Sequence, residues 1–189
     1  MNKPRILVAG IGNIFLGDDA FGVEVVRRLS QRSLPSEVHV ADFGIRGLDL
    51  AYELLEEHEA VILVDAISRK GTPGTLYVLH PEPADAEPGS EPPALSLLDA
   101  HDLNPMNVLA LARKLGSTLE RVLLVGCEPL TTGDDTHIPD GLSEPVEAAA
   151  REAVDLVMSL IVQLRENLSP FETTSSSHKL PPSSKGAEA

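Results

Sequence analysis

The chain has 189 residues, of which 42% are hydrophobic and 3% aromatic, and its formal net charge is −14. This length and hydropathy predict a single domain with an aliphatic core. The acidic balance argues against nucleic acid and anionic membranes as partners, because no basic stripe is available to neutralise phosphates. The single cysteine excludes an internal disulfide framework and is typical of the reducing cytoplasm, where we expect the protein.

The functional prediction depends on residues 5–22, RILVAGIGNIFLGDDAFG. Ile6–Ala9 predicts a buried strand, and the glycines that follow allow a sharp turn. Asp18 and Asp19 then open an amphipathic helix that continues to Leu29. The two acids are therefore expected at the carboxyl end of the first strand, where open parallel sheets place their chemistry. The glycines and Asn13 interrupt the apolar run, which we interpret as a strand and not as a signal peptide or membrane span.

A dinucleotide-binding turn is the alternative for this segment. Its fingerprint requires glycine where this chain has Phe15, and Asp18 and Asp19 would place two negative charges where a diphosphate lies. Asp42, at the end of the next strand, could mimic the acid that binds a ribose, but it cannot offset that repulsion. We therefore expect a cation here and no nucleotide cofactor. In a purely structural alternative, Asp18 is an N-cap and Asp19 complements the helix dipole, and we favour that explanation for Asp18.

The second and third predicted strands set the topology. Residues 37–42 alternate in polarity, and Ala60–Val64 is continuously apolar, as expected for a central strand that ends at Asp65. Strands alternating with helices predict a parallel sheet with right-handed crossovers. In the strand order 2-1-3, Asp19 and Asp65 would face each other across a crevice. A turn residue that caps the following segment is the equally weighted alternative for Asp65.

A short turn separates the third strand from Thr75–His80, so this strand should be antiparallel and lie at an edge. Residues 81–100 predict an acidic, proline-rich loop that leads to His101. A helix follows at residues 104–115, with Asp102 or Asn104 as its cap. Spacing alone makes His101 an ordinary residue at a helix start, although none of the other histidines is better placed as a ligand.

The last part of the chain completes the predicted sheet and its cover. Arg121–Gly126 predicts a further parallel strand. Cys127 follows it, and we interpret this residue as a small buried side chain, not as a thiolate ligand or nucleophile. A second acidic loop leads to Ser143, the expected N-cap of a helix from Glu144 to about Leu164.

These elements predict an α/β three-layer sandwich. Its mostly parallel twisted sheet has about five strands, one of them an antiparallel edge strand, and helices cover both faces. We expect residues 1–167 to form this domain and residues 168–189, rich in serine, proline and lysine, to be a disordered tail.

The order and spacing of several short motifs resemble those of the hydrogenase maturation proteases, the endopeptidases that trim the C-terminus of the nickel-iron hydrogenase large subunit. The motifs are GIGNIFLGDDAFG, DFGIRG, VDA, AHDLNP, VGCEP and GLSEPV, and they cover roughly residues 5–160. The resemblance implies a five-stranded, mainly parallel sheet between helices and a cleft in which three residues bind a divalent metal. Matched motif by motif, these residues are Asp19, Asp65 and His101. Family members often carry glutamate at the first position, and aspartate is one methylene shorter, which bears on metal distance and affinity.

The resemblance also implies a mechanism and a partner. Two carboxylates and one imidazole suit nickel, zinc or a similar ion, and three protein ligands leave a coordination position open. Our hypothesis is that Asp19, Asp65 and His101 hold nickel already installed in the large-subunit precursor. A water, polarised by the metal or deprotonated by a carboxylate, then attacks the adjacent peptide bond. Asp42 and residues 44–47 would shape the cleft wall, and the enzyme would work as a monomer.

Three alternatives remain open at this point. The family has been grouped with the aspartic-type peptidases, so Asp19 and Asp65 could share one proton as a dyad, which we rank lower because D-T-G motifs and an all-β pattern are absent. A non-catalytic chaperone that inspects nickel loading is a second possibility. A nucleotide-binding α/β domain is the third and weakest.

Overall fold

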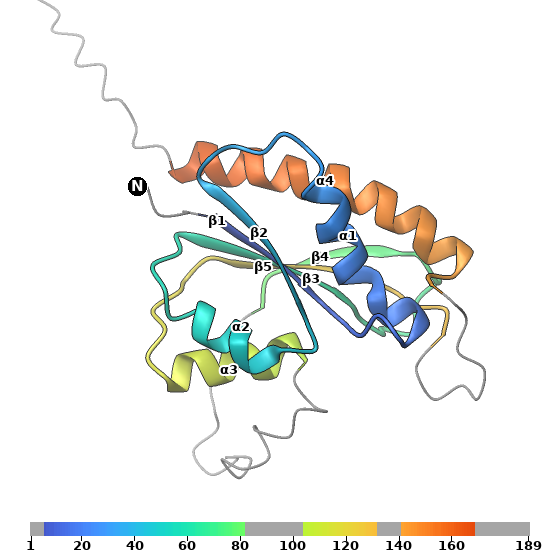
Figure 1. Ribbon diagram of the computed structural model, residues 1–189, viewed down its shortest axis with the longest axis horizontal. Helices are drawn as coiled ribbons and strands as arrows, with labels where there is room; N and C mark the ends of the chain where they lie inside the picture. The colour runs from blue at the N-terminus through green and yellow to red at the C-terminus, as the bar shows by residue number, and fades with distance from the viewer. Residues whose placement is uncertain (1–5, 82–103, 132–140, 169–189) are drawn as a thin grey trace, which may run out of the picture.

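One five-stranded sheet forms the centre of the molecule, with strand order β2-β1-β3-β5-β4 (Figure 1). The computed structural model describes residues 6–81, 104–131 and 141–168. All pairings in the sheet are parallel except the antiparallel pairing of β4 with β5. The strands are β1 (Ile6–Ile11), β2 (Val38–Gly44), β3 (Ala60–Ala66), β4 (Leu76–Leu79) and β5 (Val122–Cys127). The predicted α/β class, the 2-1-3 order and the antiparallel edge strand are all confirmed.

Helices cover both faces of the sheet, as predicted. In Figure 1, α1 and α4 lie above the sheet, and α2 and α3 lie below it. The helical elements are the 3₁₀ helix η1 (Gly17–Ala20), α1 (Phe21–Leu29), α2 (Gly47–Glu53), α3 (Pro105–Lys114) and α4 (Glu144–Leu168). The first helix was predicted to open at Asp18, but the segment begins as a 3₁₀ turn and becomes α-helical only at Phe21. The final helix extends four residues beyond its predicted end, to Leu168.

Alternate side chains of the central strands pack into two separate core clusters, one on each face of the sheet. Every residue of β1 is buried, with alternate side chains in two clusters: Ile6 and Val8 pack under α1 and α4, and Leu7 and Ala9 pack against α2 and α3. The central strands are therefore continuously apolar because both of their faces are covered. The predicted tail was to begin at residue 168, which is instead the last residue of α4. Residues 82–100 of the predicted proline-rich loop and residues 169–189 lie outside the described residues.

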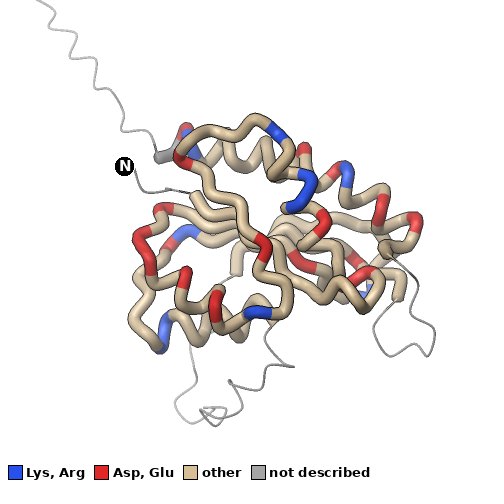
Figure 2. Tube along the Cα trace, in the orientation of Figure 1, with Lys and Arg blue, Asp and Glu red and all other residues tan. Residues whose placement is uncertain are grey.

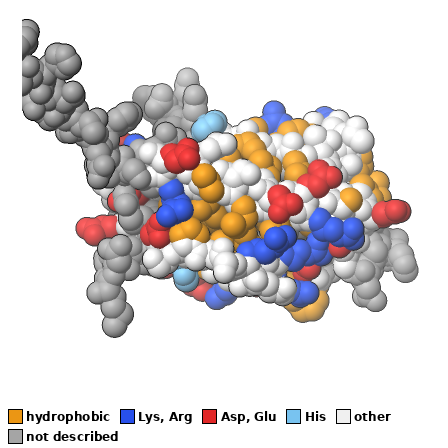
Figure 3. All heavy atoms as spheres, turned by 90° about the horizontal axis from the view of Figure 1, so that it is seen from above, with side chains coloured by type: hydrophobic (Ala, Val, Ile, Leu, Met, Phe, Trp, Pro, Cys, Tyr) orange, Lys and Arg blue, Asp and Glu red, His pale blue; other side chains and the backbone are white. Residues whose placement is uncertain are grey.

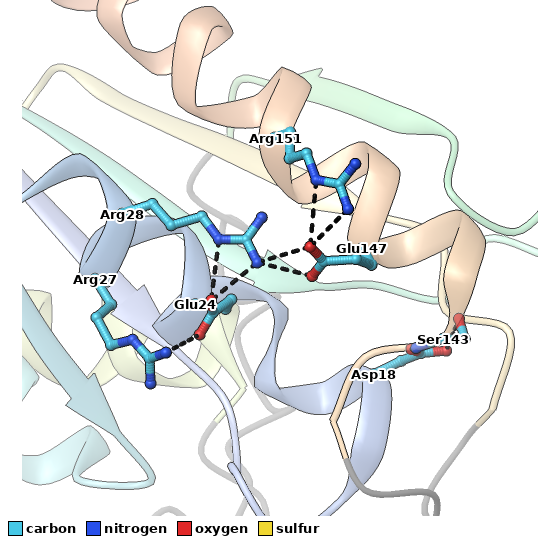
Figure 4. A network of polar contacts seen from close by, with 7 residues as sticks. All are labelled: Asp18, Glu24, Arg27, Arg28, Ser143, Glu147 and Arg151. Carbon is cyan, nitrogen blue, oxygen red and sulfur yellow. Dashed lines mark hydrogen bonds and ion pairs between the residues drawn. The ribbon is translucent and has the colours of Figure 1, made fainter.

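A network of ion pairs joins α1 to α4 on the upper face of the sheet. The Arg28 guanidinium donates to both carboxylate oxygens of Glu147, at 3.0 and 2.7 Å, and to Glu24 at 3.0 Å (Figure 4). Arg151 donates to the same Glu147. The hydrogen bond from Arg28 is the main reason that the pKa of Glu147 lies below its usual value. Figure 2 shows acidic and basic residues interspersed along the chain in this layer, and Figure 3 shows acidic and basic side chains interspersed on the upper face, which fits such pairing.

Close packing of α1 against the sheet depends on Gly22. A Cβ atom at this position would lie 2.1 Å from the Val64 carbonyl oxygen and 2.3 Å from the Ile11 carbonyl oxygen. Both neighbours are backbone atoms and cannot move aside cheaply. The start of α1, and η1 before it, can therefore lie directly on the carboxyl ends of β1 and β3 only because residue 22 has no side chain.

We expect Gly22→Ala to lower the free energy of unfolding by about 3 kcal/mol, because the added methyl group forces α1 away from the two strands. Urea denaturation followed by circular dichroism measures the loss. Gly116→Ala is the matched control: its Cβ would meet no atom within 4 Å, and its φ of +105° costs only backbone strain, about 1–2 kcal/mol. Equal losses in the two variants would contradict close packing as the cause.

Candidate active site

Asp19 and Asp65 are both at the carboxyl edge of the sheet, where the sequence predicted them. Asp65 is the penultimate residue of β3 and is only 7% exposed. Its Oδ1 accepts one hydrogen bond, from the Ala66 backbone N–H at 2.9 Å. Asp19 is on η1, is partly buried, and accepts a hydrogen bond from the Asn13 backbone N–H at 2.7 Å.

The Asp19 carboxylate is close enough to influence the ionisation of Asp65. The pKa of Asp65 rises from its ordinary value of 3.8 to about 8, mainly because the group is buried and further because of the charge of Asp19. Burial favours the neutral form of an acid, and a nearby like charge does the same. Asp65 thus holds a proton at neutral pH in the metal-free protein. The hydrogen bond from the Ala66 N–H is what a turn residue would make, but a turn role does not explain why the Asp65 carboxyl group is buried.

Gly12 lets η1 approach the end of β1. Its φ is +131°, and a Cβ atom there would lie 1.8 Å from the Asp19 carbonyl oxygen. The close approach of the chain's own backbone accounts for the glycine at this position.

Asp18 is a structural residue, but the predicted N-cap role is wrong. No side chain caps η1 or α1. The fully buried Asp18 carboxylate instead accepts hydrogen bonds from the backbone N–H groups of Leu130, Thr131 and Ser143, at 2.8, 3.1 and 2.7 Å. The Ser143 hydroxyl adds a fourth at 3.0 Å (Figure 4). Asp18 therefore joins η1 to the segment after β5 and to the start of α4, a long-range role that local sequence could not reveal.

Glu128 is a second buried anchor, and the sequence prediction missed it. It is 3% exposed and accepts hydrogen bonds from the backbone N–H groups of Arg69 and Lys70 and from the hydroxyls of Ser68 and Tyr77. Burial acts to raise the pKa of Glu128, but these donors outweigh it and the pKa is lowered. Glu128 thus fixes the loop that follows Asp65. The sequence did offer one signal for this role, because Glu128 directly follows a fully buried apolar strand.

Cys127 is buried, as predicted. The pKa of its thiol rises to about 12, mainly through burial and further through the charges of Asp18 and Glu128. A thiol with this pKa is not ionised at neutral pH and is a poor nucleophile or metal ligand.

His101, the third predicted site residue, lies outside the described residues. The helix that follows it is capped as one of the two alternatives predicted, with the Asn104 side chain accepting from the Asn107 N–H at 3.0 Å. Within the described ranges, no group of three or more His, Cys, Asp and Glu side chains could hold a metal ion. The structure thus brings Asp19 and Asp65 together, and the role of His101 stays a prediction.

Asp42 is exposed on β2, away from any described partner for its carboxylate. The Arg46 guanidinium donates to its backbone carbonyl and to that of Phe43, and it lies over the Phe43 ring. These contacts hold the turn between β2 and α2 at the same edge of the sheet as Asp19. The predicted contribution of Asp42 and residues 44–47 to a cleft wall stays a prediction.

Comparison with known proteins places this geometry in a family. The family model described as hydrogenase maturation protease matches residues 23–160. The chain belongs to the hydrogenase maturation protease family. Enzymes of this family process the precursor of the [NiFe] hydrogenase large subunit, and the chain is accordingly a hydrogenase maturation endopeptidase.

Individual relatives agree with this assignment. The protease is 34% identical over 160 residues to the hydrogenase 2 maturation protease of Escherichia coli, covering 83% of this chain and 90% of the relative. It is 37% identical over 155 residues to the hydrogenase expression/formation protein HupD of Rhodobacter capsulatus, covering 80% of this chain and 71% of the relative. Among solved structures, the hydrogenase maturating endopeptidase HybD from E. coli matches with a TM-score of 0.66 and 34% identity, covering 84% of this chain and 93% of that one. In the described part of the protease, no helix has the length and apolar character needed to cross a membrane.

We expect Asp18→Ala to lower the free energy of unfolding by about 3 kcal/mol, because several partly buried donors on two distant segments lose a fully buried charged acceptor. Thermal or urea denaturation monitors the change. Asp49→Ala, at a carboxylate that is 61% exposed, serves as the control and should change stability by less than about 0.5 kcal/mol. Comparable stability of the Asp18 and Asp49 variants would contradict the anchoring role.

The raised pKa of Asp65 predicts a pH-dependent stability of the metal-free enzyme. Between about pH 4 and 8 the folded protein binds a proton that the unfolded chain does not, so this stabilising contribution is complete below pH 4 and is lost as pH rises toward 8. Relative to Asp65→Asn, the wild type should lose on the order of 1 kcal/mol per pH unit in this range. Urea denaturation at pH 5, 6.5 and 8 measures the difference. Parallel curves for the two proteins would show that Asp65 titrates normally.

Proposed function

We propose that this enzyme removes the C-terminal extension of a nickel-iron hydrogenase large-subunit precursor after nickel insertion. Membership of the maturation protease family supports the reaction class. The observation that carries the assignment to particular residues is the pair Asp19 and Asp65, with the buried acid protonated beside the partly buried one at the carboxyl edge of the sheet.

Asp19, Asp65 and His101 form the proposed recognition site for the nickel of the precursor. Carboxylate oxygens and an imidazole nitrogen are suitable donors for this ion. The topology supports the third member. Because α3 leads into the start of β5 through a short connection, its other end, at Pro105, points toward the edge that holds Asp19 and Asp65, and His101 is four residues before it (Figure 1).

The two acids also suit the proton transfers of peptide hydrolysis. Water adds its oxygen to the scissile carbonyl carbon and loses a proton, and the carbon–nitrogen bond breaks as the leaving amine gains one. A carboxylate at Asp19 can accept the first proton and pass it to the amine. In the dyad alternative, in which Asp65 does not ligate the ion, its protonated carboxyl group can supply the second proton. The nickel of the precursor would polarise the carbonyl or the water. For Asp65 to bind that ion it must lose its proton, so binding of the precursor would be linked to proton release.

The decisive experiment incubates the purified protein with nickel-loaded large-subunit precursor and follows the mass of the large subunit by mass spectrometry. We expect a smaller product with the wild type and at least about a hundredfold slower cleavage with Asp19→Asn or Asp65→Asn, because each removes a proton-transfer group or ligand. Cys127→Ala should retain cleavage within about twofold, since its thiol is buried and un-ionised.

Each alternative has its own outcome in this assay. Full activity in both carboxamide variants would discard the site assignment. Intact precursor held in a stable complex with the wild type would support the nickel-checking chaperone instead. Asp49→Asn, an exposed aspartate on α2, controls for a general effect of removing negative charge.

A further inference from the structure

Two large apolar side chains are held in solvent at the tip of a hydrogen-bonded turn, residues 13–16. Ile14 is 58% exposed and Phe15 is 77% exposed. The Phe15 N–H donates to the Asn13 side-chain oxygen at 3.0 Å, and the Leu16 N–H donates to the Asn13 carbonyl at 3.1 Å. The turn is thus fixed by its own hydrogen bonds, and the exposure of its tip is not the result of a loose loop.

The same turn is bonded directly to a proposed site residue. The Asn13 backbone N–H donates to the Asp19 carboxylate at 2.7 Å, and the Asp19 N–H donates to the Leu16 carbonyl at 3.2 Å. The turn that carries Ile14 and Phe15 is therefore joined to Asp19 by hydrogen bonds at both of its ends and adjoins the Asp19 carboxylate.

A second pair of exposed apolar residues lies on the adjoining loop. Ile45 is 65% exposed and Leu48 is 40% exposed. The loops after β1 and β2 leave the sheet together, because Ile11 pairs with Gly44 and the Gly12 N–H donates to the Gly44 carbonyl at 3.1 Å. We call Ile14, Phe15, Ile45 and Leu48 the apolar rim.

We propose that the apolar rim binds the part of the large-subunit precursor that borders the scissile peptide bond, through apolar side chains of that segment. This inference rests on the proposed function and adds the chemistry by which the substrate is recognised. An endopeptidase requires a polypeptide at this position, and large exposed apolar side chains grouped beside a site are typical of protein contacts. The nearby Arg46 guanidinium donates to two backbone carbonyls and lies 3.9 Å from the Asp49 carboxylate, so its charge has a partner within the chain. The exposed apolar side chains therefore supply the proposed contact.

The test compares the double variant Ile14→Ser/Phe15→Ser with the wild type in the precursor cleavage assay. We expect KM to rise about tenfold while kcat changes by less than about twofold, because the variant removes apolar binding contacts and leaves the acids in place. The wild-type KM should change little between low and high salt. Leu115→Ser, with an apolar side chain 46% exposed at the far end of α3, should leave both constants unchanged.

Other occupants of the rim give different results. An unchanged KM in the double variant would overturn the inference while wild-type cleavage leaves the proposed function intact. A lower melting temperature of the variant would mean that another part of this chain packs on the rim, and loss of a wild-type dimer in size-exclusion chromatography would mean that a second copy does. Each of these also overturns it. If the wild type does not cleave, the proposed function fails, and the rim is still tested by comparing precursor binding of the double variant and wild type.

Discussion

The burial of one carboxyl group, Asp65, is the constraint around which the active edge of this protein is arranged. The carboxyl end of β3 lies inside the sheet, and the first turn of α1 is packed onto it because Gly22 has no side chain. That packing brings Asp19 near Asp65. Burial disfavours the charged form of Asp65 and the charge of Asp19 adds to this effect, so the pKa of Asp65 rises to about 8.

Three buried acids at this edge have different environments, and their hydrogen bonds distinguish them. Asp18 and Glu128 each accept several hydrogen bonds from distant segments. Asp65 accepts one local backbone hydrogen bond and keeps its proton. A buried acid that the fold satisfies is a structural anchor, whereas one that is left with a raised pKa is available for chemistry or for a cation. This contrast is the physical basis for proposing Asp65 as a site residue and for interpreting Asp18 and Glu128 as structural anchors.

The two anchoring acids therefore hold the same segments that carry the proposed site residues. Asp18 holds the segments after β5 and before α4 against η1, and Glu128 holds the loop after β3. Each anchor has a sequence neighbour with a different role: Asp19 follows Asp18, and Cys127 precedes Glu128. The charge of Asp19 acts on Asp65, while Cys127 is an inert part of the core. Adjacent residues differ in role because successive side chains leave a strand or a helical turn in different directions.

The sequence by itself determined the strands, the helices and their order, because apolar runs and periodicities reflect which faces are covered. It also located Asp19 and Asp65 at strand ends. Only the tertiary structure decided which acids are anchors, because the donors to Asp18 are 112 to 125 residues away along the chain and those to Glu128 are 51 to 60 residues away. No local pattern encodes partners at such separations. The exposure of Ile14 and Phe15 was likewise undecidable from sequence, since an apolar residue after a buried strand reads as core until the turn's own hydrogen bonds direct it into solvent.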